Sequence, residues 1–116
     1  MRNGLYSIHA DLLDGRSGKG SGVAVFRNGE ILGGDAYLYY VGTYTISDGN
    51  FKGALQVMQH TKSPEVNPLF GGQTQPVGVG ISGTFTETTA TMNGTALVGK
   101  ASQLFRATLR RLADSD

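Results

Sequence analysis

The sequence predicts an all-β fold, a single small up-and-down barrel of about eight antiparallel strands. Two features predict it. Apolar and polar residues alternate in short runs, as they do in half-buried strands, and Gly-rich turn pairs separate those runs. The 116 residues are enough for one domain with its own core, so we assign residues 1–116 to a single barrel domain. The 18 glycines suit many tight turns between short strands.

Composition excludes several function classes. The chain has no cysteine, which excludes a disulfide framework, a thiolate zinc site and a cysteine nucleophile. A formal net charge of +1 provides no long-range field that would select a partner. No apolar run approaches the roughly 20 residues of a membrane-spanning helix, and the first residues lack the apolar core of a signal peptide. We therefore expect a cytoplasmic protein without a membrane span.

The first strand is expected at residues 4–12, where apolar and polar side chains alternate. A polar, Gly-rich loop follows at residues 14–20. The next two strands flank Asn28-Gly29, because Asn-Gly readily supplies the two φ > 0 residues of a type I′ hairpin turn. Gly-Gly-Asp at residues 33–35 is expected to form a bulge or sharp bend, with the aspartate accepting a local backbone N–H. If Gly34 has φ > 0, Gly34→Val should destabilise the protein by about 1–3 kcal/mol.

The second half of the chain repeats this organisation around one long irregular segment. Asp48-Gly49 predicts a second hairpin, and Asn93-Gly94 predicts a third. Residues 61–76 contain all three prolines and allow one short helical turn; such a segment is either a lid or partner loop or an inert connection. The end of the chain fits helical or strand spacing, and we favour a strand because a barrel needs a closing partner. The expected turn residues are Asn28, Gly29, Gly33, Gly34, Asp35, Asp48, Gly49, Asn93 and Gly94, and the candidate partner-loop residues are Pro64, Glu65, Leu69 and Phe70.

An eight-stranded barrel is just wide enough to be filled by side chains or to hold one small molecule. If it holds a ligand, that ligand is expected to be small and apolar. The predicted cavity lining is Tyr6, Ile8, Val23, Val25, Tyr39, Leu55, Val57, Val79, Ile81 and Phe85.

Several strings look like chemical motifs but lack the context that the chemistry needs. Residues 78–83 spell the Gly-x-Gly-x-x-Gly dinucleotide fingerprint, yet a threonine-rich extended run follows where a helix is required. The favoured interpretation is a strand whose glycines let another strand or side chain pack closely. Gly18-Lys19-Gly20-Ser21 lacks the earlier glycine and the Mg²⁺-binding hydroxyl of a P-loop.

The histidines and tyrosines have structural interpretations as well. No carboxylate stands at a ligand-like spacing from His9 or His60, so we predict no metal site. A triad of Ser21, His9 and Asp35 can be written down, but no nucleophile elbow orders it. Tyrosines cluster in residues 33–50 without any Lys or Arg among them, which argues against a nucleic-acid stacking platform. We predict no catalytic residues and no cofactor, and we do not expect an enzyme.

Three patterns stand out along the first 60 residues. They are Gly4-x-Tyr6-x-Ile8, then Gly20-x-Gly22-Val23-x-Val25, and then Asn28-Gly29-x-Ile31-x-Gly33-Gly34-Asp35-x-x-x-Tyr39-x-x-Gly42-x-Tyr44. These patterns resemble the GrlR family, whose best-known members are negative regulators of type III secretion. Looser similarity to the wider family continues at His60, Ser63-Pro64, Leu69-Phe70-Gly71 and the closing Phe105-x-x-x-Leu109-x-x-Leu112.

The resemblance implies a lipocalin-like barrel with an apolar interior, often a homodimer, that acts by binding rather than by chemistry. In the regulator, an acidic surface run is linked to capture of an activator protein, and the corresponding hairpin here is Ser47-Asp48-Gly49-Asn50. Two hypotheses follow. The first is a non-enzymatic regulatory protein that binds a protein partner, such as a transcriptional activator. The alternative is a carrier or sensor of a small apolar, lipid-like ligand in the barrel interior.

Overall fold

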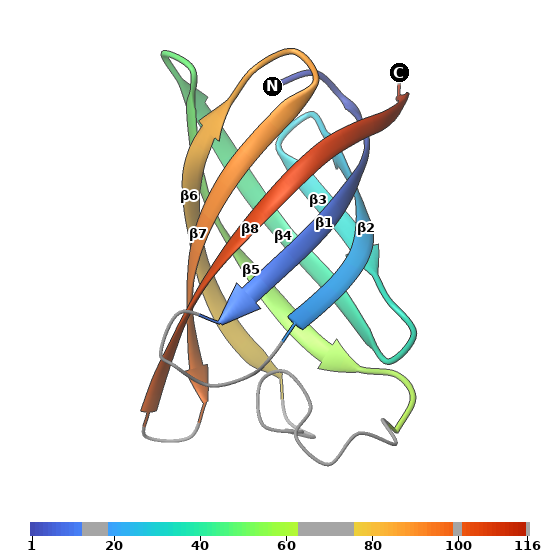
Figure 1. The fold of residues 1–116 in the computed structure, drawn as a ribbon, viewed down its shortest axis with the longest axis vertical. Coiled ribbons are helices and arrows are strands. Elements are labelled where there is room, and N and C mark those ends of the chain that lie inside the picture. Colours follow the sequence, from blue (N-terminus) through green and yellow to red (C-terminus); the bar gives the residue numbers. More distant parts are fainter. Residues whose placement is uncertain (13–18, 63–75, 99–100, 116) are drawn as a thin grey trace.

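The computed structural model describes residues 1–12, 19–62, 76–98 and 101–115, and its strands form one closed antiparallel barrel (Figure 1). Each strand pairs with the next in sequence, and β8 pairs with β1 to close the barrel. The strands are β1 (Gly4–Leu12), β2 (Lys19–Arg27), β3 (Glu30–Gly34), β4 (Leu38–Ser47), β5 (Asn50–Gln59), β6 (Val77–Phe85), β7 (Thr89–Val98) and β8 (Ala101–Asp114). The predicted all-β, eight-stranded, up-and-down barrel is confirmed.

The favoured strand at the end of the chain is also confirmed, since β8 forms the closing partner of β1. The helical turn that the sequence allowed at residues 61–76 falls on residues 63–75, outside the described residues, as do the candidate partner-loop residues Pro64, Glu65, Leu69 and Phe70. Within the described residues, no helix is long and apolar enough to cross a membrane.

Two of the three predicted hairpin turns are confirmed. Asn28 and Gly29 have φ of 50° and 84°, and Asp48 and Gly49 have φ of 49° and 78°. These are the left-handed conformations that Asn-Gly and Asp-Gly tolerate at the two central positions of a tight hairpin. Both turns lie at the end of the barrel that also holds the two termini, which we call the upper end (Figure 1).

The third predicted hairpin turn, at Asn93-Gly94, is wrong, because both residues lie inside β7. The chain reverses earlier, where the Thr86 backbone N–H donates to the Thr89 carbonyl at 2.8 Å. The Thr86 hydroxyl also accepts the backbone N–H groups of Thr88 and Thr89, at 3.3 and 3.1 Å. Threonine therefore acts as a turn residue here, through its side chain, and its high strand propensity concealed the turn.

The Gly-Gly-Asp segment bends one residue later than predicted. Gly33 and Gly34 complete β3, and neither has a positive φ. The bend begins at Asp35, whose Oδ1 accepts the backbone N–H groups of Tyr37 and Leu38 at 2.8 Å each. The predicted role of Asp35 as a local acceptor is thus confirmed, whereas the premise of φ > 0 at Gly34 is wrong.

A different physical reason supports the expected loss of stability in Gly34→Val. A Cβ at Gly34 would lie 2.6 Å from the Leu38 carbonyl oxygen, which is backbone and cannot move aside cheaply. We therefore still expect a loss of about 1–3 kcal/mol from steric overlap, measured as a lower urea midpoint. An unchanged midpoint would contradict this account of the bend.

Aromatic side chains fill the upper half of the interior. The ring of Phe26 lies 5.4 Å from both Tyr6 and Tyr44 and 6.4 Å from Phe51, which in turn lies 6.4 Å from Phe85. These centroid separations are typical of packed aromatic pairs. Tyr6 and Phe26 are almost completely buried.

Of the ten residues predicted to line the interior, seven face the core and three do not. Val23 and Tyr39 are 42% and 39% exposed, and Val25 is half-buried on the same outer face as Val23. The inward positions of β2 are instead Ala24 and Phe26, both 1% exposed. Apolar residues occupy both faces of β2, so the sequence alternation did not show which alternate residues face the core. A shift of one residue exchanges the inner and outer faces of a strand. The residues that face the core as predicted are Tyr6, Ile8, Leu55, Val57, Val79, Ile81 and Phe85.

Candidate functional site

Inward-facing glycines make room for large side chains. A Cβ at Gly94 would collide with the ring of Phe105, and one at Gly22 would lie 2.8 Å from the Tyr40 hydroxyl. At Gly83 a Cβ would lie 3.0 Å from the Phe51 ring. The interior at these positions is therefore closely packed, with a bulky side chain opposite each glycine.

Gly78 and Gly80 on β6 differ from these inward glycines. Both are exposed on the outer face, and a Cβ at either position would meet nothing within 4 Å. Neither residue has a positive φ. The interpretation of the Gly-x-Gly-x-x-Gly string as close packing is correct for Gly83 and wrong for Gly78 and Gly80. Glycine in the middle of a strand lowers the stability of the fold. Neither a turn nor close packing requires glycine at these two positions.

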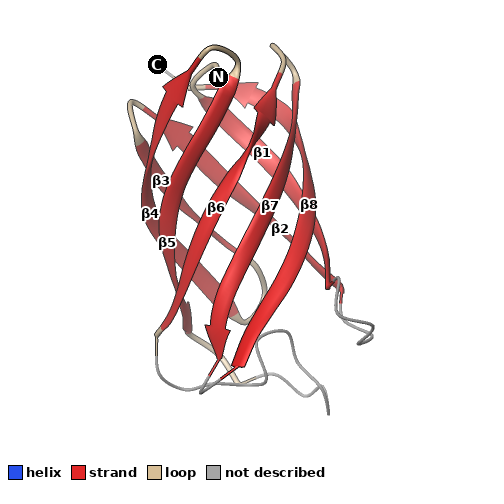
Figure 2. Cartoon of the chain, turned by 90° about the vertical axis from the view of Figure 1, so that its left-hand side faces the viewer, coloured by secondary structure: helices blue, strands red, loops and turns tan. Residues whose placement is uncertain are grey.

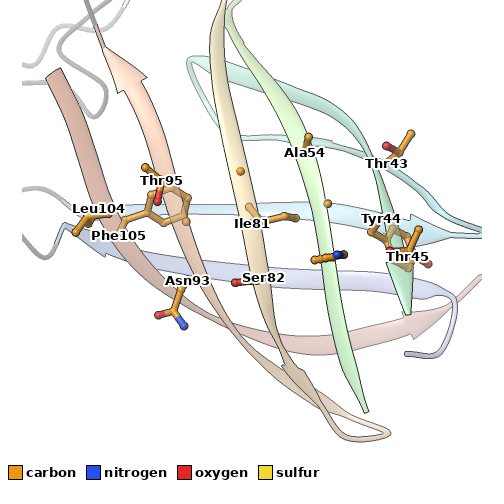
Figure 3. A pocket seen from close by; sticks show the side chains of 14 residues that line it. Thr43, Tyr44, Thr45, Ala54, Ile81, Ser82, Asn93, Thr95, Leu104 and Phe105 are labelled. Atoms are coloured by element: carbon orange, nitrogen blue, oxygen red, sulfur yellow. The ribbon is translucent and has the colours of Figure 1, made fainter. Parts of the chain in front are cut away.

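A hollow of about 830 Å³ lies on the outer wall at Gly80 and extends from β4 to β8. Figure 2 shows this wall, with β6 and β7 between β5 and β8. We call this site the outer hollow. Thr43 and Thr45 lie on its β4 flank and Leu104 on its β8 flank, with Ser82 between them (Figure 3). The outward-facing residues that line it are Thr43, Thr45, Lys52, Ala54, Gly80, Ser82, Asn93, Thr95 and Leu104.

Small side chains produce the concavity. Ala54 and Gly80 are cross-strand partners in the middle of the wall, while the buried residues Ile81 and Phe105 close it from the interior side. A second hollow of about 490 Å³ adjoins the first through Lys52 and runs toward the β4–β5 turn. The wall thus carries a long, shallow depression that is open to solvent.

A polar cluster at the end of the barrel opposite the two termini stabilises the connection between β3 and β4. The Tyr40 hydroxyl donates to Asp35 Oδ2 at 2.9 Å, and burial together with the Asp35 carboxylate raises the pKa of Tyr40 well above its usual value. His60 Nε2 lies 3.0 Å from the backbone oxygen of Asp35, and its Nδ1 lies 2.7 Å from Thr61 Oγ1. The histidine therefore contacts the Asp35 carbonyl and not its carboxylate, an arrangement that positions the β3–β4 connection.

The structure does not assemble the triad that can be written from the sequence. His9 and Ser21 are cross-strand partners on β1 and β2, and both are exposed. The Asp35 carboxylate is already bonded to Tyr40 and to two backbone N–H groups. Among the described residues, no three His, Cys, Asp or Glu side chains group together as metal ligands would.

A second exposed surface is apolar. Leu32 and Val41 are cross-strand partners on β3 and β4, 56% and 43% exposed, and Val25 continues the same row on β2. Surface patches of this kind often mark contacts with other molecules. The sequence alternation indicated apolar residues in these strands but did not predict that they would face outward.

The outer hollow was not predicted from the sequence. The available signal was the glycine at position 80, which stands between the apolar residues Val79 and Ile81. Compared with known proteins, the chain matches no protein-family model and no curated protein. Its resemblance to the GrlR family therefore stays a prediction.

Proposed function

We propose that this protein is a non-enzymatic binding protein that acts by holding a protein partner against the outer hollow. The observation that carries the proposal is the open space above Gly80, which lines the outer hollow. A strand glycine that neither a turn nor close packing requires lowers the stability of the fold. A binding role for the hollow explains this loss of stability, since functional sites commonly carry residues that are not the most stable choice for their local structure.

The shape of the hollow favours a protein over a small molecule. Small-molecule sites bury about 70–90% of the ligand surface in a cleft or cavity. The outer hollow is instead a broad depression across five strands, and a partner segment can contact much more of it. The resemblance to the GrlR family supports a regulatory role for such binding, with a transcriptional activator as one kind of partner and homodimerisation as an accompanying property.

The proposed function is tested by filling the hollow. Gly80→Val places a side chain in open space, and Ser21→Val adds similar bulk to an exposed position on β2 as a matched control. Both variants and the wild type are used for affinity capture from a lysate of the native host. We expect one stoichiometric partner that wild type and Ser21→Val retain and Gly80→Val loses. Retention by Gly80→Val, or repeated failure of the wild type to capture a partner, would contradict the proposal.

A small apolar ligand inside the barrel is the second candidate, because one observation favours it. Gln103 on β8 is 4% exposed, and its Oε1 has no hydrogen-bond partner. An unpaired buried acceptor costs about 1–3 kcal/mol, and a ligand hydroxyl or amide would supply the missing donor. Gln103 lies near the start of β8, the strand that begins at the end of the barrel opposite the two termini (Figure 1).

The Gln103→Leu variant tests whether a ligand occupies the barrel interior beside Gln103. If the site is empty, the variant removes the unpaired acceptor and should stabilise the protein by about 1–3 kcal/mol in urea unfolding. If a ligand binds there, native mass spectrometry of protein purified from cells should show added mass in the wild type and less of it in Gln103→Leu. A clean apo mass for the wild type would remove the carrier hypothesis.

A further inference from the structure

One outward row of the β5–β8 wall places two cations on either side of two short polar side chains. The cross-strand partners in this row are Lys52, Ser82, Asn93 and Arg106, and all four are exposed. The first three also line the outer hollow. Because neighbouring strands lie about 4.8 Å apart, the Cα atoms of Lys52 and Arg106 are separated by about 14 Å.

The charges in this row are available to an external anion. Strands β5, β6 and β7 contain no Asp or Glu. Arg106 Nε donates to Asn93 Oδ1 at 3.3 Å, which leaves its two terminal nitrogens for other acceptors. Asp11 is the cross-strand neighbour of Arg106 on β1, on the side away from the hollow. The ion pairs in the described part of the chain join Arg2 and Arg111 to Asp114, at the upper end of the barrel.

The adjacent row supplies an apolar floor. Ala54 and Gly80 are cross-strand partners, and the row continues through Thr95 to Leu104. The hollow therefore combines a cationic edge with a small, apolar floor. An occupant that complements both has carboxylates along one side and small or apolar groups beside them.

We infer that the outer hollow binds an extended acidic segment of a partner protein. Two carboxylates about four residues apart in the segment contact Lys52 and Arg106, since four extended residues span about 13 Å. Small or apolar side chains between them lie over Ala54 and Gly80. A second copy of this wall would bring the same cations face to face without carboxylates, which disfavours self-association through the hollow. This inference rests on the proposed function.

The test uses a displayed library of random twelve-residue peptides, selected on the wild-type protein and counter-selected on Gly80→Val. Selected peptides are synthesised with a fluorescent label, and their affinities are measured by anisotropy. We expect enrichment of Asp and Glu, and weaker binding as the salt concentration rises. Lys52→Gln combined with Arg106→Gln should raise Kd about tenfold. Arg27→Gln combined with Lys62→Gln changes the net charge equally at exposed positions away from the hollow and should leave Kd within about twofold.

The outcomes distinguish the two proposals. Hollow-dependent peptides without acidic enrichment, or with affinities unchanged in the Lys52/Arg106 variant, would overturn the acidic partner and leave the proposed function standing. A library that yields no peptide discriminating wild type from Gly80→Val would overturn the segment-binding hollow, while affinity capture tests the proposed function separately. Sedimentation showing a dimer that Gly80→Val dissociates would identify a second copy as the occupant and overturn the inference.

Discussion

Gly94 and Gly80 lie on neighbouring strands of the same wall, and one faces the interior while the other faces solvent. Gly94 is buried and leaves room for the Phe105 ring, whereas Gly80 is exposed and nothing occupies the space beside it. Packing explains the first glycine completely. The second glycine is explained by the hollow that it maintains. A strand glycine is therefore informative about function only when a Cβ at its position would meet no neighbouring atom.

The largest expected effect on stability comes from adding a side chain at the inward-facing Gly94. Gly94→Val should lower stability by about 1–3 kcal/mol, because the new side chain overlaps the Phe105 ring in a packed core. Urea unfolding measures the change. Adding Phe105→Leu should recover part of the loss, since the shorter side chain vacates some of the space. A double variant no more stable than Gly94→Val would contradict packing against Phe105 as the cause.

A smaller effect is expected where the Tyr40 hydroxyl occupies the space beside Gly22. Tyr40→Phe removes the bond to Asp35 and should cost about 0.5–1.5 kcal/mol at neutral pH. The raised pKa of Tyr40 means that its contribution is fully present below about pH 10, the unfolded value, and is lost as pH rises through the folded pKa. The stability difference between wild type and Tyr40→Phe should therefore narrow above pH 10.

Unfolding by urea across that pH range measures the difference for Tyr40. Tyr39→Phe, which removes the hydroxyl of an exposed tyrosine on the same strand, is the matched control. A wild-type advantage over Tyr40→Phe that stays constant from pH 8 to pH 11 would show that the tyrosine is not held neutral by burial and by Asp35.

The smallest effect on stability is expected at Gly80. Gly80→Val should leave stability unchanged or raise it by up to about 1 kcal/mol, because valine favours strands and meets no neighbour here. The urea midpoint relative to wild type measures this effect. A clear loss of stability would mean that Gly80 is required by packing after all, and the distinction between the two glycines would fail.

Much of the fold could be predicted from local chemistry. Asn28-Gly29 and Asp48-Gly49 adopt positive φ as expected, and Asp35 accepts local backbone N–H groups. The failure at Asn93-Gly94 has a clear cause, since Gly94 accommodates a ring from the next strand. A turn dipeptide and a packing glycine look the same in sequence, because the side chain that fills the space, Phe105, is 11 residues away along the chain.

The candidate site could not be predicted to the same extent. The outer hollow depends on the pairing of Ala54 with Gly80 and on the row that joins Lys52 to Arg106, which come from distant parts of the chain. The candidate partner loop falls outside the described residues, so the prediction for it is untested. Three lining residues were assigned to the wrong face because β2 and β4 carry apolar side chains on both faces.

The strand-forming runs and two of the tight turns follow from local sequence, since alternation and Asn-Gly or Asp-Gly chemistry act over a few residues. Which face of each strand points inward, and which glycines have a neighbouring side chain in the space beside them, depend on the folded barrel. Both depend on register across the barrel, where a shift of one residue exchanges interior and surface. The outer hollow and its cationic edge belong to this second group, because the hollow forms only when β4 to β8 lie side by side and the cationic edge only when β5 to β8 do.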